Sequence, residues 1–163
     1  MKTHINITKH FVEKQMTDRS MVLHNDQNVN DWYQAYDKFS NQESRLVKIY
    51  DWNSEKLTFK MNVAKGINLG DNQTVLALDR HERRHIAKEV VSLYANMHTF
   101  SIGDLLFWHK DFNVTNLIYN PKKQTVTLID PDSFQIINAL DINANLHGPF
   151  VDTLYNIKQW ELL

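Results

Sequence analysis

Apolar residues recur at intervals of three or four in three segments of the chain, which predicts three amphipathic helices. The segments are residues 29–39, residues 82–98 and about residues 149–163. Asn28 stands where the N-cap of the first helix is expected, because a side-chain amide oxygen can accept a hydrogen bond from a free N–H of the first turn. The second segment has the most regular apolar stripe, formed by Ile86, Val90, Leu93, Tyr94 and Met97.

Alternating apolar and polar residues predict strands in the remaining sequence. Residues 46–52 and 57–63 alternate on either side of a turn and predict a hairpin, and residues 5–16 carry a weaker strand pattern. A second hairpin is expected from residues 117–119 and 125–129, which flank an Asn-Pro-Lys-Lys turn. Because the strands form separate antiparallel groups and do not alternate with helices, the pattern favours an α+β fold over a doubly wound sheet.

Composition limits the classes of function. The chain has 163 residues, 42% hydrophobic and 23% charged, which suits one domain or two small lobes with a real core. A net charge of −1 provides no general attraction for nucleic acid or an anionic membrane, so neither is an expected partner. The absence of cysteine, of a long apolar run and of an apolar N-terminal segment leads us to expect a cytoplasmic protein.

Candidate chemistry is concentrated in the segment Trp108-His-Lys-Asp-Phe-Asn-Val-Thr-Asn116 and in Leu128-Ile-Asp130. The spacing H-x-D-x4-N followed by I-D is typical of loops that hold a nucleotide-bound metal beside a general base. Asp111 is the candidate base, because a carboxylate can orient a hydroxyl group and accept its proton. Asn116 and Asp130 are the candidate magnesium ligands, because Mg²⁺ prefers oxygen donors.

These two motifs resemble the catalytic loop and metal-binding segment of the protein kinase-like superfamily, with the aminoglycoside phosphotransferase and choline kinase branch as the closest likeness. The resemblance extends over about residues 82–134 and implies ATP and magnesium as cofactors, with His109 ordering the loop. It implies a truncated α+β kinase-like fold. Residues 1–65 would form a reduced N-terminal lobe of an antiparallel sheet and one helix, and residues 66–163 a shortened helical C-terminal lobe.

Upstream of the motifs, the resemblance assigns further nucleotide-binding positions. Lys14 is the candidate for the lysine that contacts the α- and β-phosphates, and Asp31 stands for its usual helical glutamate partner. The segment Lys60-Met61-Asn62 lies where backbone groups would meet the adenine.

The sequence also departs from the family pattern. No glycine precedes Gly66, so a glycine-rich phosphate loop is missing, and Asp130-Pro131-Asp132 replaces the usual D-F-G. Asp132 would either add a metal contact or cap a turn. Position 113, two residues after the candidate base, is Asn where protein serine/threonine kinases typically carry Lys.

Three functions follow from the sequence. The first is a phosphotransferase that moves the γ-phosphate of ATP to a hydroxyl group of a protein or small molecule. The second is a catalytically weak or inactive pseudokinase-like module that binds a partner protein or a second copy of itself. The third is a zinc hydrolase, because His81-Glu82-Arg-Arg-His85 matches H-E-x-x-H. The neighbouring arginines and an apolar stripe that begins at Ile86, beside the histidines and not beneath them, disfavour this third alternative.

Overall fold

The computed structural model describes residues 4–16, 29–97, 99–103, 105–138, 140 and 144–162, so the expected N-cap Asn28 lies outside it. The helices are α2 (Val29–Gln42), α3 (Asn72–Leu76), α4 (Arg80–Met97) and α5 (Gly148–Leu162). The strands are β1 (Ile5–Ile7), β2 (Phe11–Gln15), β3 (Ile49–Asn53), β4 (Thr58–Asn62), β5 (Ile67–Asn68), β6 (Ser101–Ile102), β7 (Leu105–His109), β8 (Leu117–Asn120), β9 (Thr125–Leu128) and β10 (Phe134–Asn138). Short 3₁₀ turns cover Val114–Asn116, Pro131–Ser133 and Ala144–His147.

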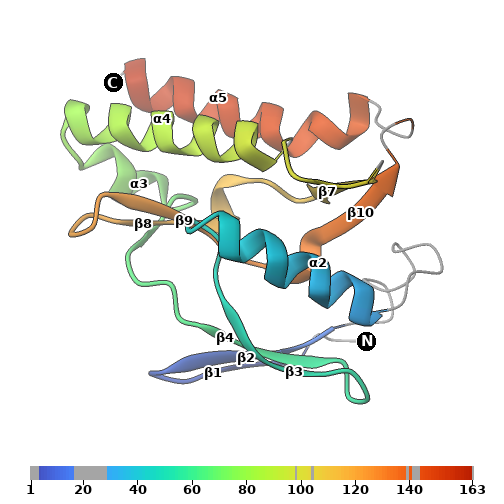
Figure 1. Ribbon diagram of the computed structural model, residues 1–163. Helices are drawn as coiled ribbons and strands as arrows, with labels where there is room; N and C mark the ends of the chain where they lie inside the picture. The colour runs from blue at the N-terminus through green and yellow to red at the C-terminus, as the bar shows by residue number, and fades with distance from the viewer. Residues whose placement is uncertain are drawn as a thin grey trace.

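An antiparallel sheet in the order β1-β2-β4-β3 forms the lower part of the molecule, and α2 lies above it (Figure 1). Phe59 and Met61 of β4 are buried, 1% and 7% exposed, whereas Lys60 between them faces the other side of the sheet. This alternation is the period-two pattern that predicted the strand.

Helix α2 joins this sheet to the upper part of the molecule, because its aromatic face contacts both. The Trp32 indole N–H donates to the backbone oxygen of Phe134 at 3.0 Å. The Tyr36 hydroxyl donates to the backbone oxygen of Val47 at 2.6 Å. Both side chains are almost completely buried, so their polar groups are satisfied inside the core.

The upper part consists of α4 and α5, which run side by side, and two small antiparallel sheets beneath them (Figure 1). These sheets have the orders β10-β7-β6 and β5-β8-β9. The connection from the lower part passes very close to β8 at Gly66, where φ is 147° and an added side chain would overlap the carbonyl oxygen of Tyr119. Only glycine fits this crossing.

The α+β class, the antiparallel groups and the three long helices are confirmed. Helix α2 continues three residues beyond the predicted end at residue 39, and the predicted ends His98 and Leu163 lie outside the described residues. Strands β7 and β10 were not predicted at all. Among the described residues, no helix is long and apolar enough to cross a membrane.

Candidate functional site

Strands β7 and β10 bring the two motifs together. They pair antiparallel with His109 opposite Phe134, and the pairing continues where the Lys110 N–H donates to the backbone oxygen of Ser133 at 2.9 Å. The loop that follows β7 and the turn that precedes β10 therefore leave the sheet at the same end. Residues 110–116 and 130–133 meet there although they are distant in sequence.

The Asp111 carboxylate is held by two amide side chains from its own loop. The Asn113 amide donates to Asp111 Oδ1 at 2.6 Å. The Asn116 amide donates to Asp111 Oδ2 at 3.0 Å and to the Asp111 backbone oxygen at 2.9 Å. The Asn116 Oδ1 atom makes no hydrogen bond to the described residues, so it is an oxygen donor available for a ligand.

Asp130 lies beside this loop because the β8–β9 hairpin returns the chain to it. The Ile129 N–H donates to the Asn116 backbone oxygen at 2.9 Å, which fixes the next residue, Asp130, beside the end of the Asp111–Asn116 loop. Asp130 is in the left-handed region at φ 68°, a conformation that Asp tolerates better than most residues. The Ser133 hydroxyl donates to Asp130 Oδ2 at 2.5 Å.

Lys14 reaches this turn from the lower sheet. Its side chain projects from β2, is 11% exposed, and donates to Asp130 Oδ1 and, at 2.6 Å, to Asp132 Oδ1. The structure therefore joins the buried Lys14 and Asp132 and the partly exposed Asp130 in one cluster, next to the Asp111–Asn116 loop.

The cluster strongly shifts the pKa of its carboxyl groups. Burial works to raise the pKa of Asp130, but the Lys14 ammonium and the Ser133 hydrogen bond hold it at about 2. Burial and repulsion from Asp130 raise the pKa of Asp132 to about 6, against the attraction of Lys14. Burial opposes the charge of Lys14, yet the two carboxylates raise its pKa above the ordinary value.

The donor set fits magnesium. With both carboxylates ionised, one ammonium faces two negative charges, and the excess charge together with the Asn116 oxygen suits a hard cation. Within the described part of the chain, no three His, Cys, Asp or Glu residues are arranged to hold a metal by themselves. Phosphate and water oxygens would have to complete the coordination, which is how Mg²⁺ is commonly held beside a nucleotide.

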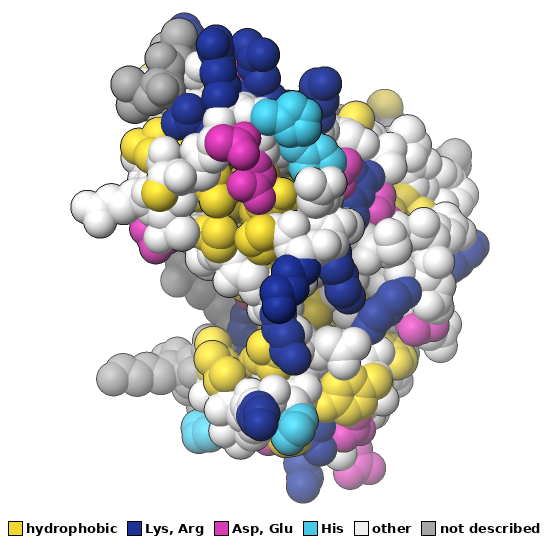
Figure 2. Space-filling model, turned by 90° about the vertical axis from the view of Figure 1, so that its left-hand side faces the viewer, with side chains coloured by type: hydrophobic (Ala, Val, Ile, Leu, Met, Phe, Trp, Pro, Cys, Tyr) yellow, Lys and Arg dark blue, Asp and Glu magenta, His cyan; other side chains and the backbone are white. Residues whose placement is uncertain are grey.

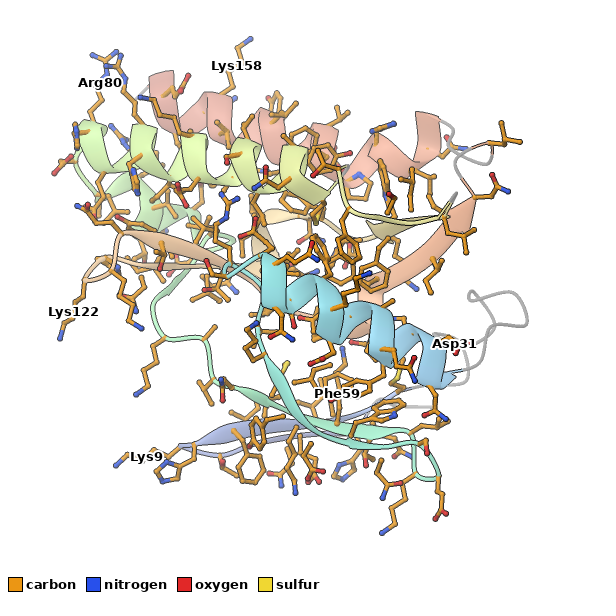
Figure 3. All side chains as sticks on the ribbon, viewed as in Figure 1. Lys9, Asp31, Phe59, Arg80, Lys122 and Lys158 are labelled. Carbon is orange, nitrogen blue, oxygen red and sulfur yellow. The ribbon has the colours of Figure 1, made fainter. Side chains whose placement is uncertain are left out.

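The structure does not bring Asp31 to Lys14. Asp31 is exposed in the first turn of α2, and Figure 3 shows it at the end of that helix. The ion pairs of Lys14 among the described residues are with Asp130 and Asp132. Asp132 thus has the place next to Lys14 that the sequence analysis gave to Asp31.

The segment Lys60-Met61-Asn62 forms the end of β4, and none of its side chains belongs to the cluster of Lys14, Asp130 and Asp132. Lys60 forms an ion pair with Asp51 at 3.0 Å on the outer face of the sheet, the face opposite to Lys14. The Met61 side chain belongs to the core, and Asn62 is exposed. The prediction for these residues concerned their backbone groups and stays a prediction.

His109 is buried inside the loop and packs between two aromatic rings. Its ring meets Phe112 and Phe134 edge-on, with centroid distances of 6.3 and 4.8 Å. Neither ring nitrogen has a hydrogen-bond partner of normal geometry among the described residues. Burial lowers the pKa of His109 to about 4, against the opposite effect of Asp130, so the ring is neutral at pH 7. The structure therefore places His109 as a packing residue beneath the loop.

Two residues of the H-E-x-x-H segment, Glu82 and His85, make contacts within the fold. His85 Nε2 lies 2.7 Å from the backbone oxygen of Gln124, and Glu82 accepts a hydrogen bond from the Tyr119 hydroxyl at 3.1 Å. His81 is exposed. These residues connect the start of α4 to the β8–β9 hairpin, and they offer no assembled zinc site.

Comparisons with solved structures identify the architecture. A candidate aminoglycoside phosphotransferase from Ralstonia eutropha superposes with a TM-score of 0.56 and 13% identity over 98% of this chain and 75% of that chain. The chain has a protein kinase-like fold. The Rio2 kinase of Chaetomium thermophilum, in a complex with ADP, Mg²⁺ and phosphoaspartate, gives a TM-score of 0.55 and 14% identity over 96% of this chain and 53% of that one.

The kinase-like neighbours come from several groups. The PK-1 kinase of Cydia pomonella granulovirus superposes with a TM-score of 0.50 and 16% identity over 78% of this chain, which spans 44% of the viral kinase. No protein-family model and no curated protein sequence matches the chain. At such identities the likeness concerns the fold alone, and it does not select one branch of the superfamily.

Proposed function

We propose that the protein is an ATP- and magnesium-dependent phosphotransferase that moves the γ-phosphate of ATP to a hydroxyl acceptor. The observation that carries this proposal is the cluster of Lys14, Asp130 and Asp132 beside the Asp111–Asn116 loop. It combines a cation suited to phosphate, oxygen donors suited to magnesium and a carboxylate suited to proton transfer. The kinase-like fold and the ADP and Mg²⁺ in the Rio2 complex support this assignment.

In this proposal Asn116 and Asp130 hold the magnesium ion, which when bound neutralises phosphate charge during transfer. Asn116 suits this role because its amide nitrogen donates to Asp111, while the Asn116 Oδ1 atom remains available as a metal ligand. Asp130 remains ionised across the physiological range, since its pKa is about 2.

Asp111 is the residue that receives the proton of the acceptor hydroxyl. Both of its carboxylate oxygens already accept one amide hydrogen bond, from Asn113 and Asn116. A carboxylate offers about four lone-pair positions, so a further hydroxyl can still bind. The two amides fix the direction of the carboxylate, so little reorganisation is needed when the acceptor arrives.

Lys14 binds the phosphates, and Asp132 holds it in position. Lys14 is shared between two carboxylates, so it can release Asp130 to a metal and stay attached to Asp132. An ammonium anchored at 2.6 Å from one carboxylate keeps its other protons for phosphate oxygens. Asp132 thereby takes the anchoring role expected of an acid on α2.

The test is ATP turnover by the purified protein with Mg²⁺ and a panel of acceptors that includes the protein itself, sugars, aminoglycosides and choline-like alcohols. We expect Asp111→Asn to reduce turnover by at least about 100-fold, the usual contribution of a general base. ATP with Mg²⁺ should still raise the melting temperature of this variant. Absence of turnover with every acceptor, in protein that is folded, would contradict the proposed activity.

One observation favours the alternative of a binding module without turnover. The turn between β1 and β2, residues 8–10, is Thr-Lys-His, so it lacks the glycines whose backbone could cover phosphates closely. For such a module we expect ATP and Mg²⁺ to raise the melting temperature without product formation, and Asp130→Ala to remove this effect.

A further inference from the structure

A pocket that lies apart from the Lys14 cluster has the composition of an anion site. It has a volume of about 680 Å³ and is enclosed by residues 44–48, residues 62–65 and the β8–β9 hairpin. Lys14, Asp111, Asn116 and Asp130 do not line it. The volume is in the range of small-molecule sites, roughly 300–1,000 Å³.

The charged side chains of this pocket are all basic: Arg45, Lys48, Lys65 and Lys123 line it, and no carboxylate does. Figure 2 shows the face on which residues 62–65 and the hairpin tip lie, where Lys and Arg side chains gather at mid-height between the lower and upper parts. The whole chain has a net charge of −1, so this gathering is a local feature and not a result of overall composition.

Most of these cations have no carboxylate partner. Arg45 is paired with Glu43 at 2.8 Å. By contrast, Lys48 bonds only neutral groups, the backbone oxygen of Ser40 and, at 3.0 Å, Asn41 Oδ1. Lys65 and Lys123 are exposed and form no ion pair with the described residues.

The three lysines without an ion pair come from separate elements, which indicates a ligand with several charges. Lys48 precedes β3, Lys65 lies in the connection between β4 and β5, and Lys123 is in the turn of the β8–β9 hairpin. Like charges from three separate elements repel one another unless an anion lies between them. Neutral donors are also present, because the side chains of Thr125 and Thr127 line the same wall.

We propose that this basic pocket binds a polyphosphate group, with Lys65 and Lys123 as its cationic contacts and Lys48 adding positive charge at its edge. Lysine binds phosphate as a point charge with three hydrogen-bond donors, whereas planar, bidentate recognition of a carboxylate is typical of arginine. Several lysines therefore favour a chain of phosphates as the ligand rather than a single carboxylate. The ligand would contact the connection from β4 to β5 and the β8–β9 hairpin at once, and so link the lower and upper parts of the molecule. This inference does not depend on the phosphotransferase activity.

The test is isothermal titration of sodium tripolyphosphate into the full-length protein, without magnesium. We expect saturable binding that Lys65→Glu/Lys123→Glu weakens at least tenfold and that added salt weakens as well. The matched control is Lys122→Glu/Lys158→Glu, which changes the net charge equally. Figure 3 shows Lys122 and Lys158 projecting into solvent, and neither lines the pocket.

The outcomes separate this site from the candidate active site. Equal affinity of the wild type and the Lys65/Lys123 variant would place the anion elsewhere, for instance at Lys14, and would overturn the proposal. An equal loss in the control variant would show attraction by net charge alone and would overturn it too. All four substituted lysines are exposed, so we expect the melting temperatures of both variants to match that of the wild type without ligand.

Discussion

Glu43 connects the end of α2 to α4, and replacing it should measurably weaken this junction. Its carboxylate accepts hydrogen bonds from the Arg45 guanidinium at 2.8 Å, from the Arg45 N–H at 3.1 Å and from the Asn96 amide at 3.0 Å. Arg45 in turn donates to the backbone oxygen of Glu89 at 3.2 Å. Glu43→Gln keeps the shape of the side chain and removes the charge on which these bonds depend.

The magnitude follows from the pKa of Glu43. Burial alone would raise it, but the bonds from Arg45 and Asn96 lower it from 4.5 to about 2. At about 1.4 kcal/mol per pKa unit this corresponds to about 3 kcal/mol. Solvent at the edge of the junction screens the pair, so we expect the free energy of unfolding of Glu43→Gln to be lower by about 1–2 kcal/mol at pH 7.

The sign of the pH dependence is fixed by the direction of the shift. A carboxyl group whose pKa is lowered by folding stabilises the fold above its unfolded pKa, and this contribution is lost as the pH falls from 4.5 toward 2. Urea unfolding followed by tryptophan fluorescence at several pH values measures it. The control is Glu55→Gln, at an exposed position in the β3–β4 turn. A Glu43→Gln deficit that stays constant between pH 7 and pH 3 would refute this reasoning.

Three further predictions concern the site and its supports. Asp132→Asn should lower ATP turnover more than Asp132→Glu does, because the Asp132 carboxylate positions Lys14 at 2.6 Å. The change in KM for ATP should be larger than the change in kcat. Equal kinetic constants for both variants would contradict this. Gly66→Ala should lower the melting temperature by several degrees, because its side chain would overlap the Tyr119 carbonyl oxygen; an unchanged melting temperature would show that this crossing is not tight. Burial lowers the pKa of His109 to about 4, so the unfolded state binds a proton at higher pH than the folded state does. The free energy of unfolding of the wild type should therefore fall by about 2 kcal/mol between pH 7 and pH 5. His109→Phe should remove that loss, and urea titrations at the two pH values would detect it.

The sequence predicted the elements whose patterns are local. Helix α4 and the hairpin of β3 and β4 follow directly from apolar spacing. Strand β7 was missed because Leu105-Leu-Phe-Trp-His109 is mostly apolar and does not alternate. The periodicity of such a short apolar run does not identify it as a strand. Its identity is decided by pairing with β10, a contact that no local pattern encodes.

The candidate site was predictable in part for the same reason. Asp111 and Asn116 are near in sequence, so their contact follows from one loop. The partners of Lys14, Asp130 and Asp132, are 116 and 118 residues away, and the β10 register and the Asp130 turn place them there. Two acids separated by one proline, with a serine directly after them, were the available signal. The Asp-Pro-Asp pattern is equally compatible with a metal contact or a turn cap, and the family pattern favoured an acid on α2 as the partner of Lys14.

The ion pairs of Lys14 also have a mechanical consequence. Lys14 belongs to the lower sheet, whereas Asp130 and Asp132 belong to the upper half, so the same contacts that define the site fasten the halves to each other. Without a ligand, these three charged groups hold the two halves together. Any movement that separates the two halves must also separate the Lys14 ammonium from two carboxylates. A cation that binds Asp130 replaces one of these two ion pairs with its own bond to the Asp130 carboxylate.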